Sequence, residues 1–177
     1  MTIRLGANPI GWSNDDLQEI GGDTPLETCL AEAKEAGFEG MEKGNKMPND
    51  GAALKAKLAE FGLVFVGGWY STELLLRSAR EEFEAAQAHI AMTKGARAGI
   101  LIAAETSSAI HGNRAAPLSK RPRLAKADWT GYGAKMTEFA SRVADVGLTL
   151  CYHHHIWARS SSPRPTSTRS WKTRRRR

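Results

Sequence analysis

Short apolar runs alternate with segments of helical periodicity through most of this chain. The runs are short enough to be strands, and they are continuous rather than alternating; they cover residues 3–8, 38–43, 63–69, 98–104 and 148–152. Helical periodicity fills the intervals at residues 24–36, 50–61, 78–94 and 128–146. The pattern therefore predicts strands and helices in strict alternation.

The ends of the predicted helices carry recognisable boundary residues. The first helix is expected to begin with Thr24 as N-cap, Pro25 at its first position and Glu27 as the acidic member of a capping box. Glycine ends helices because it tolerates a left-handed backbone. It follows three of the predicted helices, at Gly37, Gly62 and Gly147.

Continuous apolar strands joined by helices predict a parallel sheet covered by helices, an α/β fold. A doubly wound open sheet would place a glycine-rich phosphate loop after the first strand, but residues 8–12 there read NPIGW. Barrel enzymes instead gather polar groups where the strands end, and polar or aromatic residues follow each predicted strand here. We therefore predict the N-terminal portion of a (β/α)8 TIM barrel, about four and a half βα units.

The last 22 residues break this pattern. Residues 156–177 contain seven Arg, one Lys and no acidic residue, a charge of +8 that leaves residues 1–155 at −2 of the total of +6. Back-translated with permitted codons and read two bases later, residues 156–168 give a peptide that begins Met-Gly-Thr and contains a helix start. We expect a partial TIM barrel at residues 1–155, truncated by a frameshift, and a basic, disordered, out-of-frame tail at 156–177.

A basic arm that binds nucleic acid is the competing interpretation of the tail, because Arg runs neutralise phosphates. We consider it the weaker one, since no binding fold accompanies the tail. The start of the chain has no apolar run long enough for a signal peptide or a membrane span, so we expect a cytoplasmic protein without a membrane partner. Cys29 and Cys151 stand among apolar residues, and we expect both to be buried rather than paired.

The predicted strand ends supply the candidate site residues. Glu105 directly follows an apolar strand, which predicts that it enters a site or a satisfied ion pair. In the triplet at residues 153–155, strand alternation sends His153 and His155 to one face, where imidazoles suit a divalent metal or proton transfer. The polar connection at residues 106–127 is expected to be either a lid or a solvated loop.

Four segments carry a resemblance to a known family. Residues 7–16 (ANPIGWSNDD), 21–26 (GGDTPL), 67–71 (GGWYS) and 152–155 (YHHH) together resemble the inosose dehydratases of myo-inositol catabolism, members of the xylose-isomerase-like barrel superfamily. In that family a Met-Gly-Thr segment follows the histidines, as in the shifted reading frame of the tail. The resemblance implies a hydro-lyase that removes water from 2-keto-myo-inositol, a cyclic polyol ketone.

The resemblance also implies cofactors and roles. We expect a divalent metal, manganese or cobalt, with glutathione as a further requirement in some members. His153 is the expected metal ligand, and Glu105, Lys43 and His155 are the candidates for the catalytic acid and base. The expected substrate-binding residues are Asn8, Trp12, Glu42, Trp69 and Tyr70. Family ligands from later strands are missing, so we expect the chain as written to be inactive; a sugar isomerase or epimerase is the alternative enzyme.

Overall fold

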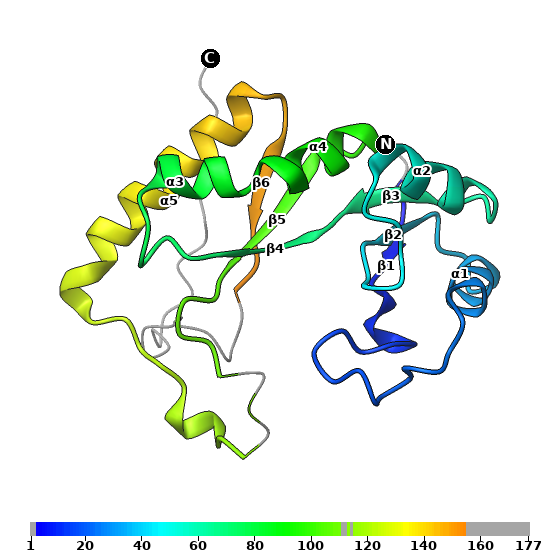
Figure 1. Cartoon of the computed structure of the whole chain (residues 1–177), viewed down its shortest axis with the longest axis horizontal. Helices are drawn as coiled ribbons and strands as arrows, with labels where there is room; N and C mark the ends of the chain where they lie inside the picture. Colours follow the sequence, from blue (N-terminus) through cyan, green and yellow to red (C-terminus); the bar gives the residue numbers. More distant parts are fainter. Residues whose placement is uncertain (1–2, 111–112, 114, 155–177) are drawn as a thin grey trace.

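A computed structural model describes residues 3–110, 113 and 115–154 of the 177-residue chain (Figure 1). Strands and helices alternate as the sequence pattern predicts. Their order is β1 (Gly6–Ala7), the 3-10 helix η1 (Pro9–Gly11), α1 (Leu26–Glu35), β2 (Gly40–Glu42), α2 (Gly51–Ala59), β3 (Val64–Gly67), β4 (Trp69–Thr72), α3 (Ala79–Ala85), α4 (Gln87–Gly95), β5 (Ile100–Glu105), η2 (Leu118–Lys120), η3 (Lys126–Asp128), α5 (Trp129–Asp145) and β6 (Thr149–Tyr152).

All paired strands are parallel, in the orders β1-β2-β3 and β4-β5-β6. Backbone hydrogen bonds continue across the junction of the two groups: Lys43 N donates to Gly67 O at 3.1 Å, and Ile102 N donates to Gly68 O at 3.2 Å. Strands β3 and β4 therefore act as one barrel strand that pairs with β2 along its first half and with β5 along its second. The described part has five strand positions in sequential order, as predicted.

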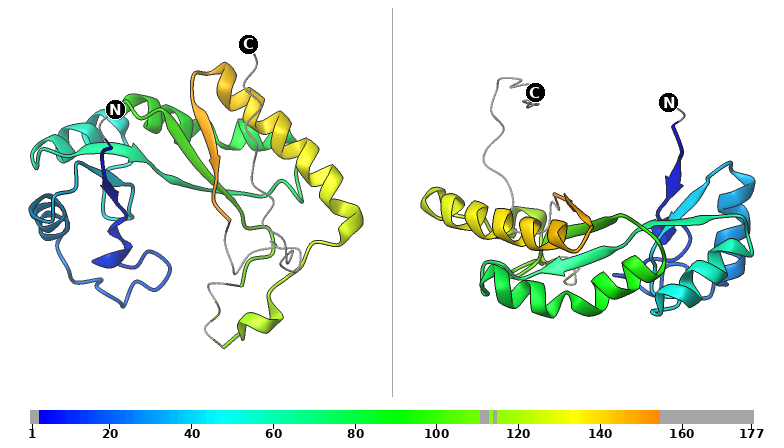
Figure 2. Two further views of the ribbon diagram at one scale, coloured as in Figure 1. Left: turned by 180° about the vertical axis from the view of Figure 1, so that it is seen from behind. Right: turned by 90° about the horizontal axis from the view of Figure 1, so that it is seen from above.

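The helices lie along one side of this curved row of strands (Figures 1 and 2). Helix α1 buries Cys29, Leu30 and Ala33, which fall on one face at helical spacing. Asp50 is the N-cap of α2, with its side chain accepting a hydrogen bond from Ala53 N at 2.8 Å. The predicted glycine stops are confirmed: each has a positive φ just past a helix, 91° at Gly37, 65° at Gly62 and 85° at Gly147.

Two details of the helices differ from the prediction. The N-cap of α1 is Pro25 rather than Thr24, and no side chain caps this helix. The predicted helix at residues 78–94 is two helices, α3 and α4, separated at Ala86. There the Gln87 side-chain amide donates to the carbonyl of Phe83 at 3.0 Å, the acceptor that the Gln87 backbone N–H would use in a continuous helix.

Gly51 allows the start of α2 to touch the end of α4. A Cβ atom at this position would lie 2.4 Å from the carbonyl oxygen of Met92 and 2.8 Å from the Cα of Gly95. Both neighbouring atoms belong to the backbone and cannot rotate away. Only glycine therefore fits the observed distance between these two helices.

The buried apolar side chains form two clusters between strands and helices. The first core cluster joins β1, β2 and β3 to α1, α2 and the end of α4; it contains Ala7, Leu30, Ala33, Met41, Met47, Leu54, Leu58, Leu63, Phe65, Met92, Ala96 and Ala98. The second core cluster joins β5 to α3, α4 and α5; it contains Leu74, Ala79, Ala86, Ile90, Leu101, Ala103, Tyr132, Phe139, Val143 and Leu148. Helix α4 contributes to both.

Cys29 is buried as predicted, but Cys151 is exposed, and this part of the prediction is wrong. The reason lies in the position of β6, which pairs with β5 on one side only among the described residues. An apolar strand is buried on both faces only when neighbouring strands continue the sheet. In the described ranges, no helix combines the length and apolarity needed to cross a membrane.

Candidate functional site

Asn8 and Glu42 meet at the ends of the first two strands. Asn8 directly follows β1 and caps η1, because its Oδ1 accepts from Ile10 N at 2.9 Å. Its Nδ2 donates to Glu42 Oε2 at 2.7 Å. Since parallel strands present their carboxyl ends at one edge of the sheet, two of the predicted substrate-binding residues lie together there.

Lys43 follows Glu42, and its side chain bends toward the backbone of the loop that comes directly after it. Its Nζ donates to the carbonyl oxygens of Gly44 at 3.2 Å and Met47 at 3.3 Å. Burial lowers the pKa of the Lys43 ammonium below its ordinary value, and the Asp15 carboxylate opposes this change in part. A lysine with a lowered pKa releases its proton more readily than a solvated one, which is the property expected of a base.

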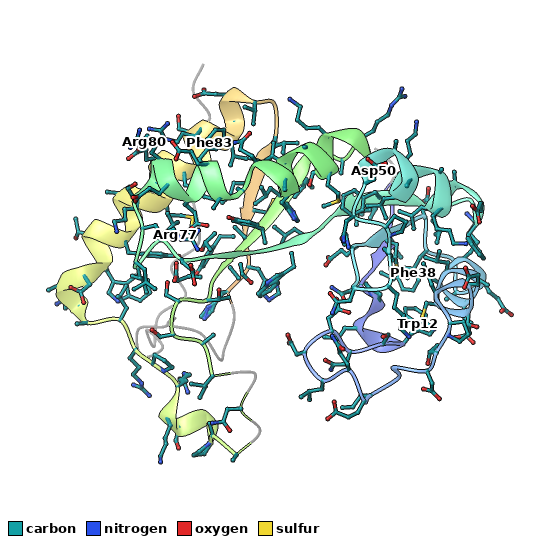
Figure 3. All side chains as sticks on the ribbon, viewed as in Figure 1. Trp12, Phe38, Asp50, Arg77, Arg80 and Phe83 are labelled. Carbon is teal, nitrogen blue, oxygen red and sulfur yellow. The ribbon has the colours of Figure 1, made fainter. Side chains whose placement is uncertain are left out.

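Trp12 lies against helix α1. Its Nε1 donates to Glu32 Oε2 at 2.6 Å, and its ring packs on the first core cluster. Figure 3 shows Trp12 and Phe38 on the α1 side of the N-terminal half. The observed contacts of Trp12 hold the end of η1 against α1, and its role in substrate binding stays a prediction.

The side chains of Trp69 and His153 meet on the face of the strands that points away from the helices. Their ring centroids are 5.0 Å apart and their planes are inclined by 66°, an edge-to-face contact. Trp69 is the first residue of β4 and His153 follows β6, so the pair spans the strand between them, β5. The predicted metal ligand and one predicted substrate-binding residue are thus brought together.

Tyr70 occupies the opposite face from Trp69. The sequence placed both residues at a strand end, but β4 continues to Thr72, and alternation inside the strand separates the two side chains. The Tyr70 hydroxyl donates to Glu82 Oε1 at 2.8 Å among the helices. Burial, and then the Glu82 carboxylate, raise the pKa of Tyr70 above its ordinary value.

Glu105 is the last residue of β5 and is only 2% exposed. Its carboxylate accepts hydrogen bonds from Ser107 N at 2.9 Å, from the Ser107 hydroxyl and from Thr72 Oγ1 at 3.3 Å. These contacts tie the start of the 106–127 connection to the end of β4. Glu105 is therefore a buried carboxylate whose oxygens are satisfied by hydrogen bonds from one backbone N–H and two hydroxyl groups.

Tyr132 was not singled out by the sequence analysis. It is 8% exposed in the second turn of α5, and its hydroxyl has no hydrogen-bond partner among the residues that the structure describes. Burial raises the pKa of Tyr132, and the neighbouring Tyr152 and Glu105 act in the same direction. The helical spacing of Tyr132, Phe139 and Val143 indicates that Tyr132 is a core residue. The sequence does not show that Tyr152 and Glu105 lie next to it.

The C-terminal end of the 106–127 connection lies beside α5. Its Leu124 and Ala127 help to line an open cavity of about 360 Å³, together with residues of α5 and of the segment after β4: Leu74, Leu75, Asp128, Gly131, Tyr132 and Lys135. The Lys135 Nζ closes one wall, donating to Leu74 O at 2.9 Å and to Arg77 O at 2.8 Å. His155 and the tail at 156–177 lie outside the described residues.

Comparison with known proteins places this arrangement in a family. The rhizopine catabolism protein MocC of Rhizobium meliloti is 44% identical over 156 residues, which are 88% of this chain and 48% of MocC. Inosose dehydratase of Geobacillus thermodenitrificans is 34% identical over 155 residues, 87% of this chain and 52% of the relative. Inosose dehydratase of Glaesserella parasuis is 33% identical over 161 residues, 91% of this chain and 54% of the relative.

The chain belongs to the family of MocC and the inosose dehydratases. The resemblance carried by the four sequence segments is thereby confirmed, and with it membership of an enzyme family. The chain spans about half the length of the curated relatives it matches. No family model matches it.

Solved structures confirm the fold. A D-psicose 3-epimerase crystallised in the presence of D-fructose aligns with a TM-score of 0.55 at 13% identity, over 85% of this chain and 52% of the epimerase. A xylose isomerase-like TIM barrel protein from Mycobacterium smegmatis, in complex with magnesium, aligns with a TM-score of 0.56 at 15% identity, over 85% and 55%. The described residues are thus part of a TIM barrel, as predicted.

A divalent metal does not fit the described residues by themselves. Among them, no group of three His, Cys, Asp or Glu side chains is close enough to hold an ion. His153 offers one imidazole beside Trp69, whereas protein metal sites commonly use three or four ligands. Further ligands would have to come from outside the described ranges.

Proposed function

We propose that this chain is the N-terminal half of a hydro-lyase that removes water from 2-keto-myo-inositol in inositol catabolism. The observation that carries the proposal is the match to MocC and to inosose dehydratases over nearly nine-tenths of the chain. The match includes the strand ends where barrel enzymes place their chemistry.

The site geometry supports a division of roles. Asn8 and Glu42, joined at 2.7 Å, offer hydrogen-bonding groups of the kind that bind the hydroxyls of a polyol. Trp69 provides an apolar surface for the ring of the substrate. His153 is the metal ligand that this chain would supply, to a site completed by residues beyond the described ranges.

Dehydration beside a ketone needs a base for the α-proton and an acid for the departing hydroxyl. We assign the base to Lys43, because burial lowers its pKa toward the range in which an amine accepts a proton. Glu105 is engaged by Thr72 and Ser107, so we assign it the positioning of the connection after β5. His155 remains the candidate acid.

We propose further that the 177-residue chain has little activity by itself. The described strands supply one metal ligand, and the other ligands and half of the barrel interior would come from additional strands. Loss of such groups removes stabilisation of the transition state rather than only substrate affinity.

A chimaera tests the proposal. Residues 1–155 would be fused to the part of MocC that lies beyond its match to this chain, and the consumption of 2-keto-myo-inositol would be measured with added manganese, cobalt or magnesium. We expect turnover by the chimaera and at least a thousandfold lower rate for the 177-residue chain, about 4 kcal/mol in activation free energy. A folded chimaera that leaves the ketone untouched would refute the assigned reaction. A 177-residue chain within about tenfold of the chimaera would refute the claim of inactivity.

The role of Lys43 has a matched control in the same chimaera. Lys43→Met should lower kcat and shift the pH profile, whereas Lys55→Met, at an exposed position of α2, should change neither. Equal effects of the two substitutions would remove Lys43 from the proposed chemistry.

A compound of rhizopine catabolism is the second candidate substrate. The observation in its favour is the higher identity to MocC, 44% against 34% and 33% for the two dehydratases. Competition between inositol-derived ketones and rhizopine-derived compounds in the chimaera assay shows which of the two substrate classes is preferred.

Nucleic-acid binding by the basic tail is tested by comparing duplex affinity with and without residues 156–177. An affinity that falls steeply with salt and is lost on truncation would support it.

A further inference from the structure

His89 is a half-buried histidine to which the proposed chemistry gives no role. It lies on α4, where this helix crosses the junction of β3 and β4 on the helix side of the strands (Figure 1). Its Nε2 atom is shielded from solvent and has no hydrogen-bond partner among the residues that the structure describes. Such a shielded polar atom is uncommon in proteins and costs stability unless the side chain serves another purpose.

Gly68 brings the His89 side chain next to Lys43. A Cβ atom added at Gly68 would lie 3.2 Å from His89 Cε1 and 3.2 Å from Lys43 Cβ. The Phe65 ring borders the same space, with its Cζ atom 3.5 Å from that position. The imidazole and the lysine stem are thus separated by no more than the width of a methyl group.

Tyr70 also packs against the imidazole. The ring centroids of Tyr70 and His89 are 5.4 Å apart, and their planes are inclined by 48°. Tyr70 is itself held by the hydrogen bond from its hydroxyl to Glu82 Oε1 at 2.8 Å. The His89 ring therefore has contacts from three consecutive strand positions and is fixed beside the Lys43 stem.

The charges around this pair favour a neutral imidazole. Burial lowers the pKa of His89 below its ordinary value, the Gly68 backbone opposes this change, and the Lys43 ammonium adds to it. Burial also lowers the pKa of Lys43, against the opposing effect of Asp15. Tyr70 keeps its proton at neutral pH, because its pKa is raised. His89 thus contributes uncharged bulk, rather than charge, to the surroundings of Lys43.

We propose that His89 is a positioning residue for Lys43: its neutral ring fills the space beside Gly68, keeps water from the lysine stem and makes the ammonium easier to deprotonate. Exclusion of water removes stabilisation from the charged form of an amine. A protonated His89 would add a second positive charge across Gly68, which the low-dielectric surroundings disfavour. The inference rests on the proposed role of Lys43 as the base, but it concerns proton affinity and is tested without substrate.

The first test is a titration of Lys43 in the 177-residue chain, followed by nuclear magnetic resonance of isotope-labelled lysines. His89→Ala removes the ring and should raise the Lys43 midpoint toward the ordinary value of about 10.4. His89→Phe keeps an uncharged ring and should leave the midpoint near that of the unaltered chain. Lys57 is read from the same spectra as an internal control and should not change. An unchanged Lys43 midpoint in His89→Ala would overturn the proposal, as would an equal rise in both variants.

The reverse measurement leaves His89 in place. Lys43→Met removes the neighbouring ammonium, so the His89 midpoint, followed through its ring protons, should rise. Lys55→Met is the matched control, because Lys55 is exposed on α2, and it should leave the His89 midpoint unchanged. Equal His89 midpoints in these two variants would overturn the proposal.

The titrations and the chimaera assay can fail separately. If the chimaera leaves the ketone untouched while His89 and Lys43 still affect each other's midpoints, the assigned reaction is refuted and the inference about His89 stands. If the chimaera is active but the two titrations are independent, the inference about His89 alone is refuted.

Discussion

The indole of Trp69 and the imidazole of His153 make an edge-to-face contact across the strand that separates them, with ring centroids 5.0 Å apart. This contact joins the third and fifth strand positions of the barrel on its inner side. It also limits the rotation of the His153 ring, because an edge-to-face pair has a preferred inclination. A histidine held in this way is prepared to present one nitrogen in a fixed direction.

The half-buried Tyr70 and the buried Tyr132 should respond differently to loss of their hydroxyl groups. Tyr70→Phe removes a hydrogen bond to the Glu82 carboxylate and should lower the free energy of unfolding by about 2 kcal/mol. Tyr132→Phe removes a buried hydroxyl without a partner among the described residues and should cost less than about 0.5 kcal/mol, or stabilise the fold. Urea unfolding monitored by circular dichroism measures both. Equal losses in the two variants would contradict the observed hydrogen bonding.

Tyr70 should also make stability depend on alkaline pH. Its pKa in the folded protein is raised by burial and by Glu82, so the fold retains the proton more strongly than the unfolded chain does. This contribution to stability is complete below about pH 10, the ordinary tyrosine pKa, and is lost as the pH rises toward the raised value. The free energy of unfolding should fall as the pH rises above about 10, and less steeply in Tyr70→Phe. An unchanged slope in the variant would contradict this assignment.

The pKa of Lys43 should lie below the ordinary lysine value, and the pKa of Lys57 should lie above it. Burial lowers the pKa of Lys43, whereas hydrogen bonds to Glu27 and Glu60 raise the pKa of Lys57. Nuclear magnetic resonance of reductively methylated lysines, assigned with Lys43→Arg and Lys57→Arg, measures both midpoints. We expect the Lys43 midpoint below about 10.4 and the Lys57 midpoint above it. The reverse order would remove the basis for Lys43 as a base.

Glu105 should control the order of the connection that follows it. Glu105→Ala removes the acceptor for Ser107 and Thr72, and we expect faster tryptic cleavage at Arg121 and Arg123 as the connection loosens. Glu138→Ala is the control, because Glu138 is exposed on α5 and pairs with Arg142 within that helix. Cleavage at the wild-type rate in Glu105→Ala would show that other contacts hold the connection.

Manganese should bind the 177-residue chain weakly. The described residues offer no cluster of three ligands, so we expect a Kd on the order of millimolar or weaker by electron paramagnetic resonance. In the chimaera with MocC the affinity should rise, and His153→Ala should lower it by about 10- to 100-fold. A micromolar Kd for the 177-residue chain would mean that ligands outside the described ranges complete a site.

The features that local sequence determines were predictable. Gly37, Gly62 and Gly147 end their helices because the backbone there has a positive φ, which a single residue type reveals. The sequential parallel strands followed from the alternation of apolar runs and helices. The placement of Asn8 and Glu42 at the ends of neighbouring strands also followed from the sequence, whereas the hydrogen bond between them is known from the structure alone.

The features that depend on distant neighbours were missed. Cys151 lies in an apolar strand, and its exposure reflects the lack of a pairing strand on one side of β6 among the described residues. The sequence placed Tyr70 beside Trp69, just past the end of a strand predicted to stop at residue 69. Pairing with β5 instead extends β4 to Thr72, so the two side chains point to opposite faces. The break between α3 and α4 lies where the Gln87 side-chain amide, rather than its backbone N–H, donates to the Phe83 carbonyl. Helix propensities do not predict this change of donor.

The two core clusters also set an order in time. Every member of the first core cluster lies between Ala7 and Ala98, whereas the second core cluster needs Leu101, Phe139 and Leu148. A ribosome therefore synthesises all the apolar residues of the first cluster before it makes β5. Because domains fold from the N-terminus as they are synthesised, α4 can dock on the first cluster early and offer Ile90 as the template on which the later strands assemble.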